Sequence, residues 1–208
     1  GLKTFGVENA QNVTATNVAA GVDFALGLSS ATGVEDYTGT LTIKLADTTG
    51  TADSVKISTV ASGTNDDVNA TLVMAGVETT NLVISADTAL ADVQLSVAGV
   101  DSSKIVVTGG VATEDLDLTK GGTTLLNSST TTVDASAFKG TLTVSADTNT
   151  ATTMLANGGA VATLTGSSGS DTFTVGKTSA KTHVIDGGTG SDTVNLTLTT
   201  GTTVMTSM

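Results

Sequence analysis

Short runs of alternating apolar and polar residues recur along the whole chain. Clear examples cover residues 40–45, 54–60, 71–75, 81–86, 93–98, 104–108, 141–146, 172–175 and 193–199. Clusters of Asp, Asn, Gly and Ser separate these runs, and apolar residues do not keep a helical spacing over any long stretch. Alternation with a period of two places every second side chain on one face of a strand. The pattern therefore predicts an all-β protein with many short strands.

The spacing of these runs predicts how the strands are connected. Two interleaved series of apolar residues, each with steps of roughly 20 residues, can be drawn through the chain. The first is Leu41, Val60, Leu82, Ile105, Leu125, Leu142, Leu164 and Ile185, and the second is Val55, Val73, Leu95, Leu116, Val133, Met154, Phe173 and Val194. Two strands per coil of about 20 residues are typical of a parallel β-solenoid or β-roll-like rod. The same strands could instead close a β-sandwich.

Composition fits a solenoid in two respects. The chain has no Pro, which would remove a backbone N–H that an interior strand needs for pairing. It has 44 Thr residues, and stacked β-branched side chains pack well on a pleated surface. We expect residues 1–35 to form a first coil or cap and residues 36–208 to form the solenoid.

Charge and cysteine content limit the kinds of partner and of metal site that the chain can have. The chain carries 20 acidic residues against 8 Lys and no Arg, for a net charge of -12, and the lysines do not cluster. We therefore expect no nucleic-acid partner. We also expect no direct membrane insertion, because no apolar run approaches the ~18 residues of a membrane-spanning helix. The lack of Cys excludes disulfides and thiolate metal sites. The chain opens without a basic leader, so we interpret it as an internal or processed piece of a larger exported product.

The sharpest motif lies near the C-terminal end of the sequence. Residues 187–195 read GGTGSDTVN and match the calcium-binding nonapeptide G-G-x-G-x-D-x-U-x at every specified position. Residues 166–174 read GSSGSDTFT and match at all but the second position. A looser version begins at Gly50 and keeps only the turn and Asp53.

The nonapeptide spacing suits a hard cation. Glycines let the turn take positive φ and aim carbonyl oxygens inward, while the Asp supplies charge. Calcium takes six to eight oxygens, so two turns would have to stack. The step from Asp171 to Asp192 equals one coil on this spacing. The predicted calcium ligand turns are Gly166, Gly169, Asp171, Gly187, Gly188, Gly190 and Asp192; the alternative is a pair of Gly-Ser-Asp turns that bind no metal.

Other polar residues offer weaker candidates. His183 lies near Ser179 and Asp186, but no nucleophile elbow accompanies them, so we interpret it as a surface histidine of a strand. The carboxylate clusters at residues 66–67 and 114–117 could serve glycoside hydrolysis. No aromatic platform or Arg accompanies them, so we expect solvated loops or weak cation sites.

The composition and the motifs together resemble a known family. The Thr-, Ala-, Gly- and Val-rich chain without Cys, the segment of residues 133–144 (VDASAFKGTLTV), the run from Gly76 (GVETTNLV) and the nonapeptides are similar to bacterial surface-layer proteins. The likeness is to the type I-secreted, RTX-like kind found in Campylobacter and Caulobacter. The specific motifs cover only about residues 133 to 195.

The resemblance implies a secreted, extracellular protein that assembles with itself into a calcium-dependent lattice on the bacterial cell surface. It also leaves room for cell-surface polysaccharide as a partner of flanking regions. We therefore expect a structural, non-enzymatic protein. A repeat module of an adhesin is the alternative, and a polysaccharide-acting β-helix enzyme is disfavoured because the chain has no Arg or Trp to hold a sugar.

Overall fold

The described part of the chain is all β, which confirms the predicted fold class. The structure is a computed structural model that describes residues 2–7, 12–27, 37–60, 66–85, 90–122, 125–147, 151–156, 162–175, 182–196 and 202–207. Within these ranges there are strands and turns and no helix, and hence no helix that could span a membrane. The strands are β1 (Thr4–Val7), β2 (Val13–Val18), β3 (Asp23–Leu26), β4 (Thr40–Leu45), β5 (Ser54–Thr59), β6 (Asp66–Ala75), β7 (Thr79–Ile84), β8 (Leu90–Val100), β9 (Lys104–Gly109), β10 (Asp115–Asp117), β11 (Thr132–Phe138), β12 (Thr141–Ser145), β13 (Thr153–Ala156), β14 (Ala162–Thr165), β15 (Thr172–Val175), β16 (Thr182–Asp186), β17 (Thr193–Leu196) and β18 (Thr202–Ser207).

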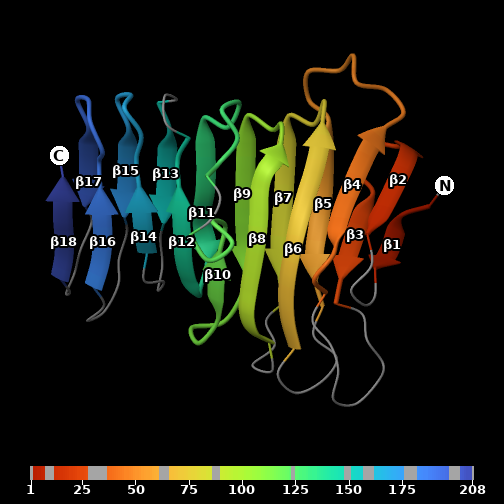
Figure 1. Ribbon diagram of the computed structural model, residues 1–208, viewed down its shortest axis with the longest axis horizontal. Helices are drawn as coiled ribbons and strands as arrows, with labels where there is room; N and C mark the ends of the chain where they lie inside the picture. The colour runs from red at the N-terminus through yellow and green to blue at the C-terminus, as the bar shows by residue number, and fades with distance from the viewer. Residues whose placement is uncertain are drawn as a thin grey trace.

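The strands form two parallel sheets that run the length of an elongated molecule. Sheet A holds the odd-numbered strands in the order β1 to β17, and sheet B holds the even-numbered strands in the order β2 to β18. Each coil of the chain therefore adds one strand to each sheet, and the two termini lie at opposite ends of the long axis (Figure 1). The strand pairs are parallel and join elements two apart in sequence, which is the connectivity of a solenoid. A β-sandwich is typically built from antiparallel neighbours, whereas the described strands pair in parallel across coils, as a solenoid requires.

A single apolar core fills the space between the two sheets. Burial alternates along many of the strands, as in β5, where Val55, Ile57 and Thr59 point inward and their neighbours outward. Inward residues of both sheets belong to one continuous cluster, from Val7 at one end to Ile185 near the other. Because only 4 Phe and 1 Tyr are present, thin layers of Val, Leu, Ile and Ala do most of the packing.

The coils differ in length along the rod. From β11 in sheet A and β12 in sheet B onward, successive coils keep the predicted interval, as in the steps of 19 residues from Thr152 to Asp171 and 21 residues from Asp171 to Asp192. Between β3 and β11, and between β2 and β12, aligned partners lie further apart, and the largest separation is that of 33 residues from Asp23 to Lys56. The extra length goes into long strands, with 10 residues in β6 and 11 in β8, and into loops such as residues 46–53. We call β2–β10 the long coils and β11–β18 the short coils.

The predicted boundary near residue 35 falls outside the described residues. On either side of it the strands continue in the same two sheets, since β1 pairs with β3 and β3 pairs with β5. The first strands therefore pair with their neighbours in the same way as the later strands of the rod.

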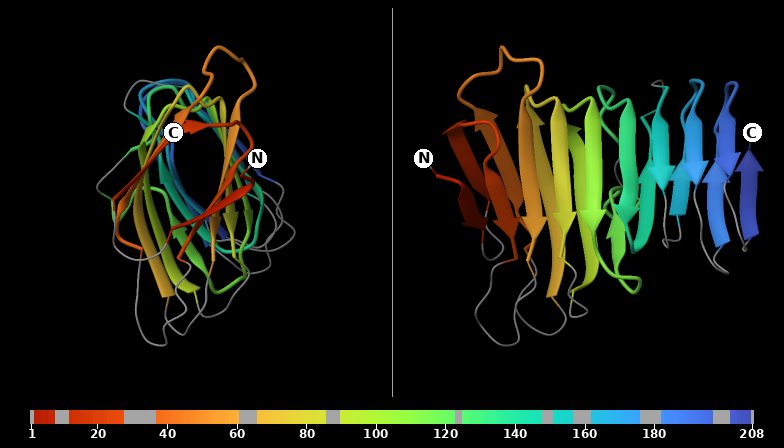
Figure 2. Two further views of the ribbon diagram at one scale, coloured as in Figure 1. Left: turned by 90° about the vertical axis from the view of Figure 1, so that its right-hand side faces the viewer. Right: turned by 180° about the vertical axis from the view of Figure 1, so that it is seen from behind.

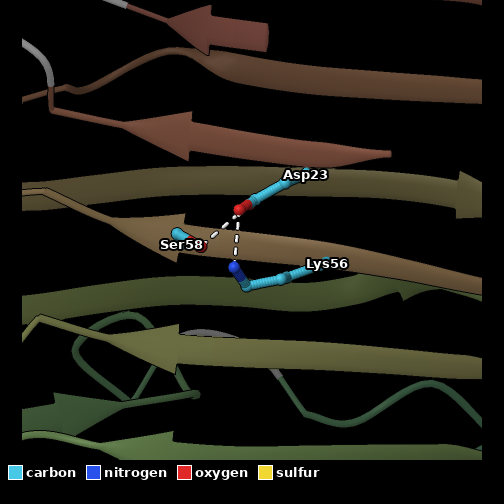
Figure 3. Close-up of polar contacts among 3 residues, drawn as sticks. All are labelled: Asp23, Lys56 and Ser58. Atoms are coloured by element: carbon cyan, nitrogen blue, oxygen red, sulfur yellow. Dashed lines mark hydrogen bonds and ion pairs between the residues drawn. The ribbon is translucent and has the colours of Figure 1, made fainter. Parts of the chain in front are cut away.

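Side chains on the outer face also join neighbouring coils. Asp23 of β3 accepts hydrogen bonds from Lys56 Nζ (2.6 Å) and Ser58 Oγ (2.8 Å), both on β5 (Figure 3). Lys104 of β9 and Asp134 of β11 form a looser ion pair at 3.4 Å. These contacts tie coils together outside the core.

Candidate functional site

The two Gly-Ser-Asp turns lie one above the other at the same edge of the rod. Residues 166–171 join β14 to β15, and residues 187–192 join β16 to β17 one coil later. Thr189 N–H donates to the carbonyl oxygen of Ser167 (3.0 Å), and Thr193 N–H donates to that of Asp171 (2.9 Å). The stacking predicted from the spacing of the two motifs is therefore observed.

Close backbone approach explains why glycine occupies these turns. Gly188 and Gly190 have φ of 81° and 133°, a region that L side chains rarely adopt. A Cβ at Gly188 would overlap the carbonyl oxygen of Ser167, and one at Gly190 would overlap that of Gly169. A Cβ at Gly166 would crowd the carbonyl oxygen of Gly187. The turns pack backbone on backbone, so the short coils depend on these glycines.

Asp171 folds back into its own turn and is 1% exposed. Its Oδ1 accepts the N–H of Thr152 from the previous coil (2.7 Å). Its Oδ2 accepts the N–H (2.8 Å) and the hydroxyl (3.1 Å) of Ser167. Three donors therefore compensate the burial of this carboxylate.

Asp192 repeats only part of this arrangement. Its Oδ1 accepts the N–H of Asp171 at 3.0 Å, which is again a contact from one coil to the previous one. Its Oδ2 is buried and has no hydrogen-bond partner. A buried carboxylate oxygen without a donor is costly, so this atom is the place in the turn pair where a cation or a further donor would be most stabilising.

The same contact occurs far away in the long coils. Asp53 N–H donates to Oε2 of Glu78 (2.8 Å), and the pairing of β5 with β7 puts these residues side by side just before their strands. Asp53 Oδ2 is buried without a hydrogen-bond partner, as Asp192 Oδ2 is. The register extends this position through the rod, and we call the series the corner column. Its members from Asp53 onward are Asp53, Glu78, Ser103, Thr131, Thr152, Asp171 and Asp192.

Hydroxyls complete the corner column where carboxylates are missing. Ser103 Oγ donates to the carbonyl oxygen of Glu78 (3.1 Å), and Thr131 Oγ1 donates to that of Ser103 (3.2 Å). These members thus bond to the backbone of the previous coil. The sequence had marked Asp53 only through the loose turn at Gly50, and it had not marked Glu78 as a site residue, although Glu78 ends one of the repeated Gly-Val-Glu runs.

The turn pair fits a calcium ion in part. In favour are the free oxygen of Asp192 and the close packing of the two turns, in which carbonyl oxygens of one turn lie against glycines of the other. Against stands Asp171, whose two oxygens already accept three hydrogen bonds. The described residues hold no group of three or more His, Cys, Asp and Glu side chains close enough for a metal. Carbonyl or water oxygens would have to supply most of the shell.

His183 is not the surface residue expected from the sequence. It is 1% exposed on the inner face of β16, and its Nδ1 accepts the N–H of Ala162 at 3.2 Å. It stands two positions before the core residue Ile185, so strand alternation points it inward. Of the triad partners considered for it, Ser179 lies outside the described residues.

The carboxylate cluster at residues 114–117 is less exposed to solvent than predicted. Glu114 is fully buried, and its Oε2 accepts the N–H of Val111 (3.1 Å). Asp117 lies at the end of β10 and accepts bonds from Thr119 N–H (2.7 Å) and Gly121 N–H (2.7 Å). The expectation of a solvated loop is therefore wrong for both residues. Residues 66–67 belong to β6, and their side chains lie outside the described part of the structure.

Comparisons of the chain with protein-family models, with curated proteins and with solved structures find no match.

Proposed function

We propose that this chain is a structural, non-enzymatic part of a secreted bacterial surface layer, and that it assembles with itself into a calcium-dependent lattice outside the cell. One observation carries the proposal: the chain is a regular two-sheet rod in which stacked Gly-Asp turns hold adjacent coils together. Such a rod is stiff, presents repeated faces and needs no ligand-binding cavity to do its work.

Calcium has a defined role in this proposal. The net charge of -12 opposes contact between neighbouring copies, and a divalent cation bound at an acidic turn reduces that repulsion. Asp192 would offer its buried free oxygen. When bound, calcium would supply positive charge and stabilise the conformation of the turn. Contacts between the protein's own residues would hold neighbouring copies together.

Electron microscopy of the protein with calcium and with a chelator tests the lattice. Ordered two-dimensional sheets that need calcium support the proposal. Isolated rods under both conditions would contradict it and would favour an adhesin module, whose support is the threonine-rich outer face of sheet B, for example Thr42, Thr141 and Thr143.

Calorimetry tests the metal site itself. Asp192→Asn keeps the shape and Oδ1 of the side chain but removes its charge, so it should weaken calcium binding and reduce the calcium-dependent rise in melting temperature. Asp101→Asn is the matched control, because Asp101 is exposed and lies away from the Gly-Asp turns. An equal loss of calcium affinity in both variants, or no heat of calcium binding in the wild type, would show that the Gly-Asp turns do not bind calcium.

A further inference from the structure

His183 is the only histidine of the chain, and it lies in the core of the short coils. β14, β16 and β18 are consecutive strands of sheet B at the C-terminal end of the rod, drawn in blue in Figure 2. His183 is the second residue of β16 and is 1% exposed. The strand register places Leu142, Ala162 and His183 in one inward column. An ionisable side chain thus takes a position that apolar residues hold in the two preceding coils.

The hydrogen bond of His183 requires a neutral imidazole. The backbone N–H of Ala162 donates to Nδ1 at 3.2 Å, so Nδ1 carries no proton and the ring proton is on Nε2. A charged imidazole has a proton on both nitrogens and cannot accept at Nδ1. Taking up a second proton would therefore break this bond. Ala162 is fully buried, so its N–H would lose this acceptor in a place that water does not reach.

The strands around the imidazole offer no opposite charge. The described strands β12, β13, β14, β15, β17 and β18 carry no Asp, Glu or Lys. The outward-facing Asp186 lies three positions further along β16, and the carboxylates of the Gly-Asp turns belong to the corner where β16 ends. Within residues 151–208 the other charged side chains of the sequence are Asp171, Lys177, Lys181, Asp186 and Asp192. The two lysines lie outside the described residues, and their charge is not one that attracts an imidazolium.

Burial and the hydrogen bond at Nδ1 both favour the neutral form of His183 in the folded chain. In an unfolded chain a histidine takes up its proton near the ordinary imidazole pKa of about 6.5. Because the unfolded state then binds the proton more readily, the stability of the folded coils is complete above about pH 6.5 and falls as the pH drops below it. Carboxyl groups of ordinary pKa titrate mainly below about pH 5. The range from pH 7.5 to 5.5 therefore isolates the effect of the histidine.

The pairing of β14 with β16 also holds the stacked turns in place. Gly166 N–H donates to the carbonyl oxygen of Asp186 (2.7 Å), and Thr189 N–H donates to that of Ser167 (3.0 Å). Both bonds join the coil that contains β14 to the coil that contains β16. Loss of this strand pairing would therefore also separate the two Gly-Asp turns.

We propose that His183 is an acid-sensitive switch of the short coils: in mildly acidic solution it takes up a proton, and the coils around β16 open while the long coils stay closed. The long coils contain no histidine that could respond in this pH range. The inference goes beyond the proposed function, because it concerns a single chain and requires neither calcium nor a lattice.

Proton NMR of the wild type, with a chelator present, measures the protonation of His183 directly. The chain has one histidine, so its imidazole gives one set of signals and needs no assignment. Between pH 7.5 and 5.5 the folded protein should keep the chemical shifts of a neutral ring, and those of a charged ring should appear only together with signals of the opened form. A ring that titrates near pH 6.5 within the folded protein would overturn the inference.

Hydrogen exchange locates the opening. After correction for the intrinsic pH dependence of amide exchange, protection of β14 and β16 should fall about tenfold between pH 7.5 and 5.5, the factor expected when the opened form alone binds one proton near pH 6.5. Protection of β7 and β9 in the long coils should change little. An equal fall in both regions, or no fall in β14 and β16, would contradict the proposal.

His183→Asn is the matched variant. The Asn side-chain oxygen can accept the N–H of Ala162 but does not titrate, so β14 and β16 should keep the same protection at both pH values, whatever the absolute stability of the variant. Glu114→Gln changes another fully buried ionisable side chain and should keep the pH dependence of the wild type. An acid-dependent loss of protection that persists in His183→Asn, or one that disappears in Glu114→Gln, would assign the effect to another group. If His183→Asn does not fold, the two wild-type measurements decide.

The outcomes separate this inference from the proposed function. Calcium-dependent sheets of a chain whose short coils do not respond to pH would leave the surface-layer proposal standing and remove the switch. Acid-dependent opening of β14 and β16 in a chain that never forms sheets would do the reverse.

Discussion

The long coils and the short coils build the same two sheets by different means. In the short coils, tight turns stack backbone on backbone, and glycines at 166, 188 and 190 allow the close approach. In the long coils, wider loops such as residues 46–53, in orange in Figure 1, connect the strands. There the outer face carries contacts between coils, such as Asp23 with Lys56 (Figure 3).

This difference shows how coil length constrains the turns. In a short coil the turn has few residues, so its backbone conformation and its packing against the previous turn depend on each other. In a longer coil, extra loop residues let the backbone hydrogen bonds and the side-chain packing be met by different residues. Substitutions in the stacked turns of the short coils should therefore be costly. In the long coils the cost should depend on the turn, because a Cβ at Gly109 would also meet a backbone carbonyl, that of Ile84, whereas no atom lies near Gly21.

The largest expected effect is that of Gly188→Ala. The change adds a side chain at positive φ and also pushes it into the carbonyl oxygen of Ser167, so we expect a loss of about 3–4 kcal/mol in the free energy of unfolding. Chemical denaturation measures it.

Gly21→Ala is the matched control in the long coils. Gly21 has nearly the same φ, 79° against 81°, but no atom lies within 4 Å of the position that a Cβ would take. We expect only the conformational cost, about 1 kcal/mol. Equal losses at the two sites would mean that close stacking on the previous turn adds nothing to the cost of positive φ.

The next effect concerns the corner column. Asp171→Ala removes a buried acceptor from three donors and should cost about 3 kcal/mol of unfolding free energy. Glu78→Ala, in the long coils, removes a half-buried side chain that accepts the N–H of Asp53, and about 1 kcal/mol is expected. A larger loss at Glu78 than at Asp171, in thermal or chemical unfolding, would reverse the comparison.

A smaller effect is expected on the outer face of the long coils. Lys56→Met keeps most of the side-chain volume but removes the charge paired with Asp23, and the expected loss is below about 1 kcal/mol. The Lys56 side chain is 44% exposed, so water screens the pair. High salt should reduce the difference in melting temperature between variant and wild type. A salt-independent loss would point to packing of the lysine stem.

The smallest effect is a pH dependence at the border between the two regions. The Ser136 hydroxyl, which donates to Asp134 Oδ1 (2.7 Å), is the main cause that lowers the pKa of Asp134; Lys104 contributes and partial burial opposes. Because the folded pKa is lower than the unfolded one, the carboxylate stabilises the fold above its unfolded pKa, and this contribution is lost as the pH falls through the folded value.

Asp134→Asn should therefore cost about 0.5 kcal/mol at neutral pH and almost nothing once the pH has fallen below the folded pKa of Asp134. Melting temperatures of both proteins across this range provide the measurement. A difference that persists unchanged in acid would show that the carboxylate charge is not its source.

The sequence predicted the fold best where the coils are short. Four consecutive members of the second apolar series, Val133, Met154, Phe173 and Val194, are direct partners in sheet A. Earlier members move between the sheets: Val55 belongs to β5 in sheet A, while Val73 lies on β6 in sheet B. A fixed interval cannot follow the long coils, since their loop and strand lengths vary independently of the core pattern.

The candidate site was predictable in position but not in detail. Glycine spacing indicated the stacked turns, because only glycine tolerates that backbone approach. Spacing could not indicate the direction of the Asp171 carboxylate, since the same residue can face a cation or its own turn. Strand alternation from Ile185 would have placed His183 inside, whereas its polarity indicated the surface.

The unequal coil lengths show that the rod tolerates insertions at its corners. Lengthening a coil from about 20 to about 33 residues costs only ~0.4 kcal/mol more in chain entropy. The long coils already include such an excursion between β3 and β5, where Phe24 and Ile57 are aligned partners and both stay 1% exposed. Inserted sequence at these corners therefore leaves the interior columns untouched. The two-sheet rod can therefore accept longer corner loops, exposed to the surroundings, at almost no thermodynamic cost to its core.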